Sequence, residues 1–184
     1  MRYLVISGLP SADLPRGCRL VADGEVVSLE QPWSFGAPLI AQIDDGADLA
    51  ALKAKPGVTA FTVEGLLPPG EGQAFAIGAH RIRDAEAFKH YIARVPDVIA
   101  RRGCRYIARG GAATAICGAF TPERLVLIEF PDADDVLSFY FSEAYAPLLR
   151  IRLTATEPRF VLLMRSGPLP EPARRAIKER LGKV

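Results

Sequence analysis

Three ionisable side chains in the second half of the chain have the chemistry for acid–base catalysis, and each belongs to a short, largely apolar segment. They are His80 at the end of Phe75–His80, Arg109 at the end of Arg105–Arg109, and Glu129 within Leu125–Phe130. A guanidinium can hold a carboxylate or an enolate, and a carboxylate or an imidazole can move a proton. These residue types therefore predict a site in which Arg109 binds an acidic substrate and Glu129 or His80 transfers a proton.

The alternation of side chains along a strand tests whether these three residues can share a face. Each segment divides into an apolar alternate set and a set that contains His80, Arg109 or Glu129. We expect the apolar sets to pack under helices and the other sets to gather the three residues beside small neighbours, as in a ligand pocket. The alternatives are a purely structural ion pair between Arg109 and Glu129, and a surface or hydrogen-bonded position for His80.

The elements that must position these residues repeat along the chain. The motif Arg16-Gly17-Cys18-Arg19 recurs as Arg102-Gly103-Cys104-Arg105, 86 positions later. Two further pairs of segments agree after a one-residue slip, 31–34 with 118–121 and 39–45 with 126–132, and both copies end on Gly-x-Leu-Pro. The Pro- and Gly-rich stretch between them has the composition of a linker. We therefore predict a first copy at 1–68, a second copy at 74–170, and a basic C-terminal helix or tail at 171–184.

The second copy has the clearer order of elements. Four strands, with Gly110-Gly111 as a bend or bulge after the second, surround two helices that Asp84 and Asp132 can cap. Pro96 predicts a kink or a break in the first helix. The βαββαβ order indicates an α+β, ferredoxin-like repeat. The first copy lacks the first helix and keeps a short second one at about 47–55, so the two sheets should pack face to face.

Comparison of the two copies adds candidates for ligand binding. Gln42 stands in the first copy where the second has Glu129, so an ionic site should exist only once. Trp33 aligns with Phe120, and the pair could form an aromatic wall for a planar ligand. The full set of ligand-binding candidates is Trp33, Gln42, Phe120, Tyr140 and Tyr145. The two tyrosines would orient a substrate or, alternatively, pack in the core with their hydroxyls bonded.

The composition narrows the class of protein. The 184 residues are 49% hydrophobic and 24% charged, which is typical of a soluble globular chain. The net charge of +2 comes from residues 171–184, and a near-neutral body argues against a nucleic-acid partner. Three cysteines without a CxxC motif and two histidines argue against a metal site and favour a reducing compartment.

Targeting and catalytic motifs are missing from the sequence. The first residues are typical of a strand rather than a signal sequence, and no apolar run reaches the roughly 20 residues that span a bilayer. GxSxG, P-loop and strand-linked GxGxxG motifs are absent. We therefore expect a cytoplasmic protein with a small-molecule ligand, no cofactor and no membrane partner.

Three segments of the second copy resemble the bacterial family called domain of unknown function 1330. The segments are Arg105–Gly111, Pro122–Pro131 and Phe139–Tyr145. The resemblance, best over residues 74–170, implies a ferredoxin-like domain of the dimeric alpha-beta barrel superfamily, in which two sheets close around a small pocket. Here the degenerate first copy, over residues 2–68, would supply the partner sheet. The resemblance thus implies two tandem ferredoxin-like repeats that form an intrachain pseudo-dimeric alpha-beta barrel, in a monomeric pseudo-dimer or a homodimer.

The resemblance to that superfamily also implies a class of activity. It favours a cofactor-independent enzyme of the monooxygenase, isomerase or cyclase type that acts on a small aromatic or lactone-like metabolite. The alternative is a non-catalytic metabolite-binding or accessory module with the same pocket. In a third interpretation the basic tail recruits a partner.

Overall fold

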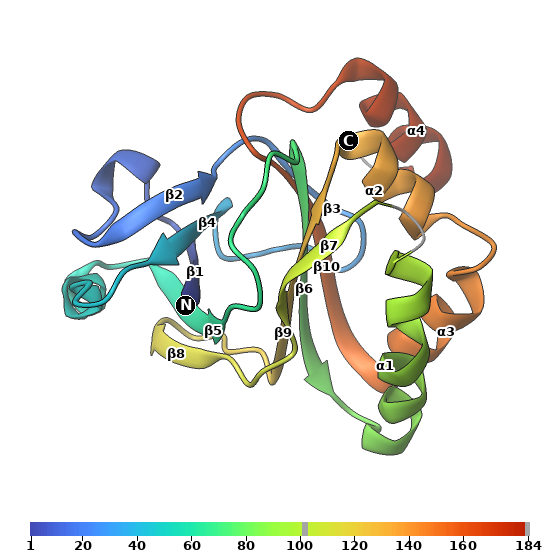
Figure 1. Ribbon diagram of the computed structural model, residues 1–184, viewed down its shortest axis with the longest axis horizontal. Coiled ribbons are helices and arrows are strands. Elements are labelled where there is room, and N and C mark those ends of the chain that lie inside the picture. Colours follow the sequence, from blue (N-terminus) through green and yellow to red (C-terminus); the bar gives the residue numbers. More distant parts are fainter. Residues whose placement is uncertain (101–102, 183–184) are drawn as a thin grey trace.

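The computed structural model describes residues 1–100 and 103–182 and has a mixed α+β fold (Figure 1). The strands are β1 (Arg2–Ser7), β2 (Cys18–Ala22), β3 (Val26–Ser28), β4 (Pro38–Ile43), β5 (Thr59–Glu64), β6 (Ala74–Ile82), β7 (Arg105–Arg109), β8 (Thr114–Cys117), β9 (Arg124–Phe130) and β10 (Thr156–Met164). The helices are α1 (Ala85–Ala100), α2 (Ala133–Tyr140), α3 (Ala146–Ala155) and α4 (Glu171–Leu181), with the 3₁₀ helices η1 (Ser11–Asp13) and η2 (Leu49–Ala54). Arg102 of the repeated motif and residues 183–184 of the predicted tail lie outside the described residues.

The strands form two antiparallel five-stranded sheets with matching order. The first sheet runs β2-β4-β1-β5-β8, and the second, taken from the corresponding edge, runs β7-β9-β6-β10-β3. The register matches as well, because a bulge interrupts the β2–β4 pair between Leu20 and Ala22 and the β7–β9 pair between Tyr106 and Ala108. These bulges lie at aligned positions of the two copies. The predicted tandem ferredoxin-like architecture is therefore confirmed.

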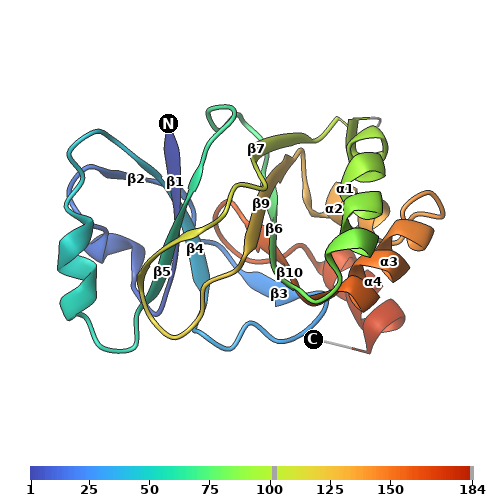
Figure 2. The same cartoon turned by 90° about the horizontal axis from the view of Figure 1, so that it is seen from below.

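Each copy contributes one strand to the sheet of the other. β3 of the first copy pairs with β10, and β8 of the second copy pairs with β5. Figure 2 shows these connections running between the two sheets. Both sheets therefore contain residues from both halves of the chain, and the division at 1–68 and 74–170 stays a prediction about sequence copies.

The two sheets face each other, and the helices cover one outer face (Figure 2). A buried cluster that includes Val5, Phe61, Phe75 and Leu127 fills the space between the sheets. A larger cluster lies between the second sheet and α1–α4. The outer face of the first sheet is covered by smaller elements, among them η2, whose Leu52 is buried. Face-to-face packing is therefore observed, and the long helices lie only over the outer face of the second sheet.

The predicted caps position the helices of the second copy. Asp84 accepts a hydrogen bond from the Ala87 N–H at 3.0 Å, and Asp132 accepts one from the Asp135 N–H at 2.9 Å. Both carboxylates thereby satisfy an N–H group that has no partner within its helix. The expected break at Pro96 is absent, because α1 continues through it to Ala100.

The C-terminal helix α4 docks on the body of the protein. Its Ala173 and Ile177 are buried, and α4 packs against α2. Arg174 Nη2 donates to Glu25 Oε2 at 2.7 Å. The basic residues of this segment are therefore attached to a folded helix. Within the part of the chain that the structure describes, no helix is both long and apolar enough to cross a membrane.

Candidate functional site

The pairing of β6 with β9 separates His80 from Glu129. Residues directly opposite each other in an antiparallel pair point to the same face. His80 is opposite Arg124, on the face covered by α1, whereas Glu129 is opposite Phe75, on the face toward the first sheet. The prediction that His80, Arg109 and Glu129 share a face is wrong. Alternation within each strand does not determine the register between strands, and the register decides which sets coincide.

A β-bulge directs Arg109 to the helix side of the sheet. Arg105 is opposite Glu129, but beyond the bulge Arg109 is opposite Val126. One extra residue in β7 reverses the alternation, so the two arginines point to opposite faces. Arg105 takes the place beside Glu129 that the sequence predicted for Arg109. The predicted Arg109–Glu129 ion pair is therefore also wrong.

A small cavity lies between α1 and the second sheet and contains two of the three predicted catalytic residues. Apolar side chains such as Phe88, Val126 and Phe160 form much of its wall. The polar residues of the wall are His80, Tyr91, Tyr106, Arg109 and Arg124. The cavity has a volume of about 20 Å³, which accommodates about one water molecule. A larger ligand therefore requires side chains of the wall to move.

His80 is the buried polar group of this cavity. Its side chain belongs to a residue that is 3% exposed, and its Nδ1 has no hydrogen-bond partner among the described residues. Burial, with repulsion from Arg152 and Arg124, holds the pKa of His80 well below its ordinary value. Gly78 leaves room for the ring, since a Cβ there would lie 3.1 Å from Nε2. The imidazole is therefore neutral at pH 7 and can accept a proton.

Arg109 and Arg124 place two positive charges at the cavity. Burial lowers the pKa of Arg124, and repulsion from Arg109 lowers it further. Neither guanidinium forms an ion pair with a carboxylate of the described residues; they lie instead near the rings of Tyr106 and Phe88, at 5.2 and 5.7 Å from the ring centroids. Two neighbouring cations without a counter-charge favour binding of an anion.

Two backbone features position these arginines. Pro96 has no N–H, so the Ile92 carbonyl of α1 lacks its usual helical donor. Arg109 Nη2 donates to that carbonyl at 3.4 Å. Gly110 has a φ of 65°, and a side chain there would overlap the Arg124 guanidinium. Gly110 therefore makes space for Arg124, which is a role that the predicted bend or bulge at Gly110-Gly111 did not include.

A buried polar chain runs from the cavity to Glu30. Tyr91 lines the cavity, and its hydroxyl oxygen lies 3.3 Å from that of Tyr145. Tyr145 accepts a hydrogen bond from Arg152 Nε at 3.0 Å, and both terminal nitrogens of Arg152 bind the Glu30 carboxylate. Tyr140 donates to Glu30 at 3.1 Å. Tyr140 and Tyr145 thus pack in the core with bonded hydroxyls, as in the alternative interpretation, and do not line the cavity.

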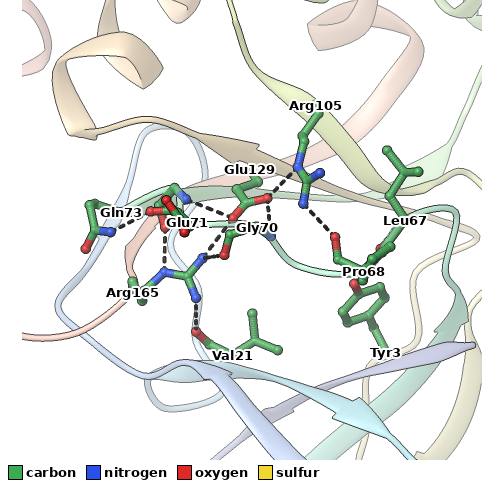
Figure 3. A network of polar contacts seen from close by, with 11 residues as sticks. Tyr3, Val21, Leu67, Pro68, Gly70, Glu71, Gln73, Arg105, Glu129 and Arg165 are labelled. Atoms are coloured by element: carbon green, nitrogen blue, oxygen red, sulfur yellow. Dashed lines mark hydrogen bonds and ion pairs between the residues drawn. The ribbon is translucent and has the colours of Figure 1, made fainter.

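Glu129 connects the linker to the second sheet and to Arg165, which follows β10 (Figure 3). Its side chain is 3% exposed. Oε2 accepts from Arg105 Nε at 2.8 Å and Gly70 N–H at 2.9 Å, and Oε1 accepts from Arg165 Nη2 at 2.8 Å and Gly72 N–H at 3.0 Å. A carboxylate has about four acceptor positions, and all are used here. The structure therefore gives Glu129 a role in packing the chain.

Trp33 and Phe120 come together, but on the face opposite to His80. Their ring centroids are 6.5 Å apart, and Phe35 stacks on Phe120 at 4.8 Å. The Arg159 guanidinium lies 4.5 Å over Phe120. These rings belong to the cluster between the two sheets. The predicted aromatic contact exists, and its use by a ligand stays a prediction.

Gln42 lies in the first sheet, outside the cavity. It is opposite Arg19, whose guanidinium donates to its side-chain oxygen. Arg19 and Gln42 align with Arg105 and Glu129, so the first copy retains a version of the same pair in which the acceptor carries no charge. Ligand binding by Gln42 stays a prediction.

Three polar residues of the cavity were not selected from the sequence. Arg124 is two residues before Val126 on the same face of β9, and Tyr91 is three residues after Phe88 on the apolar side of α1. Tyr106 lies just before the bulge of β7. Helical spacing could have identified Tyr91, whereas Arg124 and Tyr106 depended on the register between strands.

Comparison with known proteins shows the family of this chain. The family model described as domain of unknown function (DUF1330) matches residues 73–165, half of the chain. A protein of unknown function from Rhodopseudomonas palustris is 19% identical, with a TM-score of 0.45 over 52% of this chain and 83% of its own. A structure described as a putative monooxygenase from Lactobacillus acidophilus NCFM is 12% identical, with a TM-score of 0.48 over 89% and 92%. None of the curated proteins matches the chain.

Proposed function

This chain belongs to the DUF1330 family, and we propose that the cavity under α1 binds a small, anionic metabolite of aromatic or lactone-like type. The observation that carries the proposal is the pair Arg109 and Arg124, which lacks a carboxylate partner among the described residues and lies beside a buried, neutral His80. The apolar wall favours a flat, carbon-rich ligand body. The arginines supply the counter-charge for its acidic group.

The same arrangement supports proton transfer without a cofactor. The carboxylate of the bound ligand offsets the Arg124 charge that contributes to the low pKa of His80. The neutral imidazole can then take a proton from a carbon acid, and the guanidiniums stabilise the enolate that forms. Cofactor-independent isomerisation, cyclisation and monooxygenation can each begin with such an anion. An isomerase needs only to return the proton to another atom of the same ligand. The alternative, a binding module, uses the same pocket and leaves the ligand unchanged.

Ligand entry requires the wall of the cavity to open. The volume of about 20 Å³ is much smaller than the roughly 150 Å³ of a cavity known to hold benzene. Arg109 is exposed and rests on α1 through one long hydrogen bond of 3.4 Å. A carboxylate offers Arg109 a stronger, charged acceptor than the Ile92 carbonyl. We therefore expect anion binding and displacement of Arg109 to occur together.

Binding is tested by titration calorimetry with benzoate and with benzamide, its neutral isostere. We expect benzoate to bind more tightly than benzamide, and Arg109→Gln or Arg124→Gln to weaken benzoate binding at least about 10-fold, as for a charged hydrogen bond. Arg81→Gln is the matched control, because Arg81 lies over Phe120 on the other face of the sheet. Equal affinities for the two ligands, or unchanged benzoate binding in both cavity variants, would show that the cavity is not an anion site.

Catalysis is tested with phenylpyruvate, which carries a carboxylate, a ring and an acidic C–H group. In D₂O, we expect the protein to accelerate exchange of that C–H above the buffer rate, as measured by mass spectrometry. His80→Gln should remove the acceleration, and His90→Gln, a change of an exposed side chain on α1, should retain it. A ligand that binds but exchanges only at the buffer rate supports the binding module.

A further inference from the structure

The hydrogen bonds behind the cavity have a direction that the donors determine. A guanidinium can only donate, so the Tyr145 oxygen accepts from Arg152 Nε at 3.0 Å. Tyr145 is 0% exposed, and its own hydrogen needs an acceptor. The Tyr91 oxygen, 3.3 Å away, is the acceptor that the described residues offer. Either hydroxyl of this pair could donate. Donation by Tyr145 is favoured, because the reverse would leave the Tyr145 hydrogen buried and unpaired, whereas Tyr91 lines the cavity, where a water or a ligand can accept its hydrogen.

This direction leaves the hydrogen of Tyr91 without an acceptor among the described residues at the cavity. Tyr91 lines the cavity together with His80 and Tyr106. Burial raises the pKa of Tyr91 well above its ordinary value, so the hydroxyl keeps its hydrogen at neutral pH. The fully buried Arg152 cation polarises both tyrosine hydroxyls in the same direction, and such polarisation strengthens the last donor of a chain.

We propose that Tyr91 is a ligand-contacting hydrogen-bond donor, oriented by Arg152 through Tyr145, and that the ligand carries a carbonyl or enolate oxygen opposite it. The proposal rests on the proposed function of the cavity and adds a substrate class. The ligand is then a carboxylate, held by Arg109 and Arg124, with a second oxygen of carbonyl type.

The donor has a defined part in the proton transfer to His80. The C–H bond next to the carbonyl breaks, its electron pair forms the enolate, and the proton bonds to the imidazole nitrogen. The negative charge develops on the carbonyl oxygen, and a positioned O–H donor stabilises it more than it stabilises the neutral carbonyl. Tyr91 thereby lowers the barrier for the step that His80 performs.

A purely structural role for Tyr91 makes a different prediction. The Tyr91 ring stacks on Phe88 with centroids 5.4 Å apart, which would hold the helix against the sheet without any ligand. In that case, removal of the hydroxyl would affect all ligands of one shape equally. Two probes that differ only in an acceptor atom distinguish the roles: 4-formylbenzoate, with a carbonyl oxygen, and 4-vinylbenzoate, its isostere without one.

The experiment measures the affinity of the full chain for both probes by calorimetry. We expect the wild-type protein to bind 4-formylbenzoate about 3- to 10-fold more tightly, the effect of one hydrogen bond. Tyr91→Phe should abolish that preference and change 4-vinylbenzoate binding less than about twofold. Tyr145→Phe should reduce the preference without touching the cavity. Tyr140→Phe, at the far end of the chain of hydrogen bonds, should keep it.

The outcomes separate this inference from the function on which it rests. If both probes bind equally to the wild-type protein, or if Tyr91→Phe weakens both to the same extent, Tyr91 is not a ligand donor, although the anion site remains. If neither benzoate binds, the proposed function and this inference both fail.

Exchange of the tyrosine hydroxyl protons with water, measured by NMR on the wild-type protein, tests the direction of the hydrogen bonds without a variant. We expect the Tyr145 proton to be protected from exchange. A protected Tyr91 proton together with a freely exchanging Tyr145 proton would overturn the proposal.

Discussion

Replacing Glu129 by glutamine tests whether this carboxylate holds the chain together or takes part in catalysis. In the folded protein it accepts four hydrogen bonds, two on each oxygen, from Arg105, Arg165 and two linker N–H groups. Glutamine has the same shape, but its NH₂ group cannot accept. One side of the carboxamide therefore faces two donors, and both guanidiniums lose their counter-charge.

The expected loss of stability follows from burial of the four partners. One linker N–H and one guanidinium N–H lose their acceptor next to a residue that is 3% exposed, at about 1 kcal/mol or more each. Arg105 and Arg165 are 40% and 25% exposed, so water can solvate their charges, and each lost ion pair adds at most about 1 kcal/mol. We expect a total near 3 kcal/mol, which corresponds to a decrease in Tm of roughly 6–12 °C for a chain of this size.

Urea denaturation and thermal unfolding of Glu129→Gln measure this loss. Gln42→Ala is the matched control, because Gln42 and exposed Arg19 occupy the aligned positions in the first sheet, and it should change stability by less than about 0.5 kcal/mol. Affinity for benzoate should stay within about twofold of the wild-type value, since Glu129 lies on the opposite face from the cavity. A stable Glu129→Gln protein that has lost proton exchange on phenylpyruvate would refute this reasoning and restore the catalytic role predicted from the sequence.

Further changes test the cavity and the sheet interface separately. The free energy of unfolding should fall as the pH falls from 6.5 to about 5, by at most about 1.4 kcal/mol per pH unit. The reason is that His80 is protonated in the unfolded chain in this range, whereas burial opposes its protonation in the folded chain. In urea denaturation, His80→Gln should remove this pH dependence and His90→Gln should retain it. Pro96→Ala restores a helical donor for the Ile92 carbonyl, so calorimetry should show a higher Tm together with tighter benzoate binding, because Arg109 no longer has to leave that carbonyl. Weaker binding would contradict the expected displacement of Arg109. Phe120→Ala should cost about 3–5 kcal/mol of stability in urea while leaving benzoate affinity unchanged, and a loss of binding would connect the aromatic cluster to the cavity.

Features encoded by neighbouring residues could be predicted from the sequence. The repeated RGCR motif located two equivalent edge strands, β2 and β7, and the order of the sheets confirms their equivalence. Asp84 and Asp132 cap the helices as predicted, because an N-cap depends on residues within one turn. The absence of the first helix from the first copy also predicted that the two sheets must cover each other.

Features that depend on pairing between distant strands could not be predicted in the same way. The three segments with His80, Arg109 and Glu129 alternate as expected, but aligning them requires the registers of two strand pairs, β6–β9 and β7–β9. A bulge between Tyr106 and Ala108 reverses the alternation of side chains in β7. An error of one residue in either register assigns every side chain of that strand to the opposite face of the sheet. The sequence drew attention to the glycine pair after β7 as the irregular point, whereas the bulge itself lies three residues earlier, in a segment without glycine.

The asymmetry between the copies explains why a cavity forms over the second sheet. Both copies contain the bulge that reverses the edge strand, so both could direct a side chain beyond it toward the outer face. Only the second copy has a long helix, α1, between its first two strands, and α1 supplies Phe88, Tyr91 and Ile92 to the wall of the cavity. In the first copy the corresponding connection holds the three-residue η1. The sequence predicted a single site because one copy lacks the charges, but the missing helix is the stronger reason, since charged side chains without a wall would face solvent.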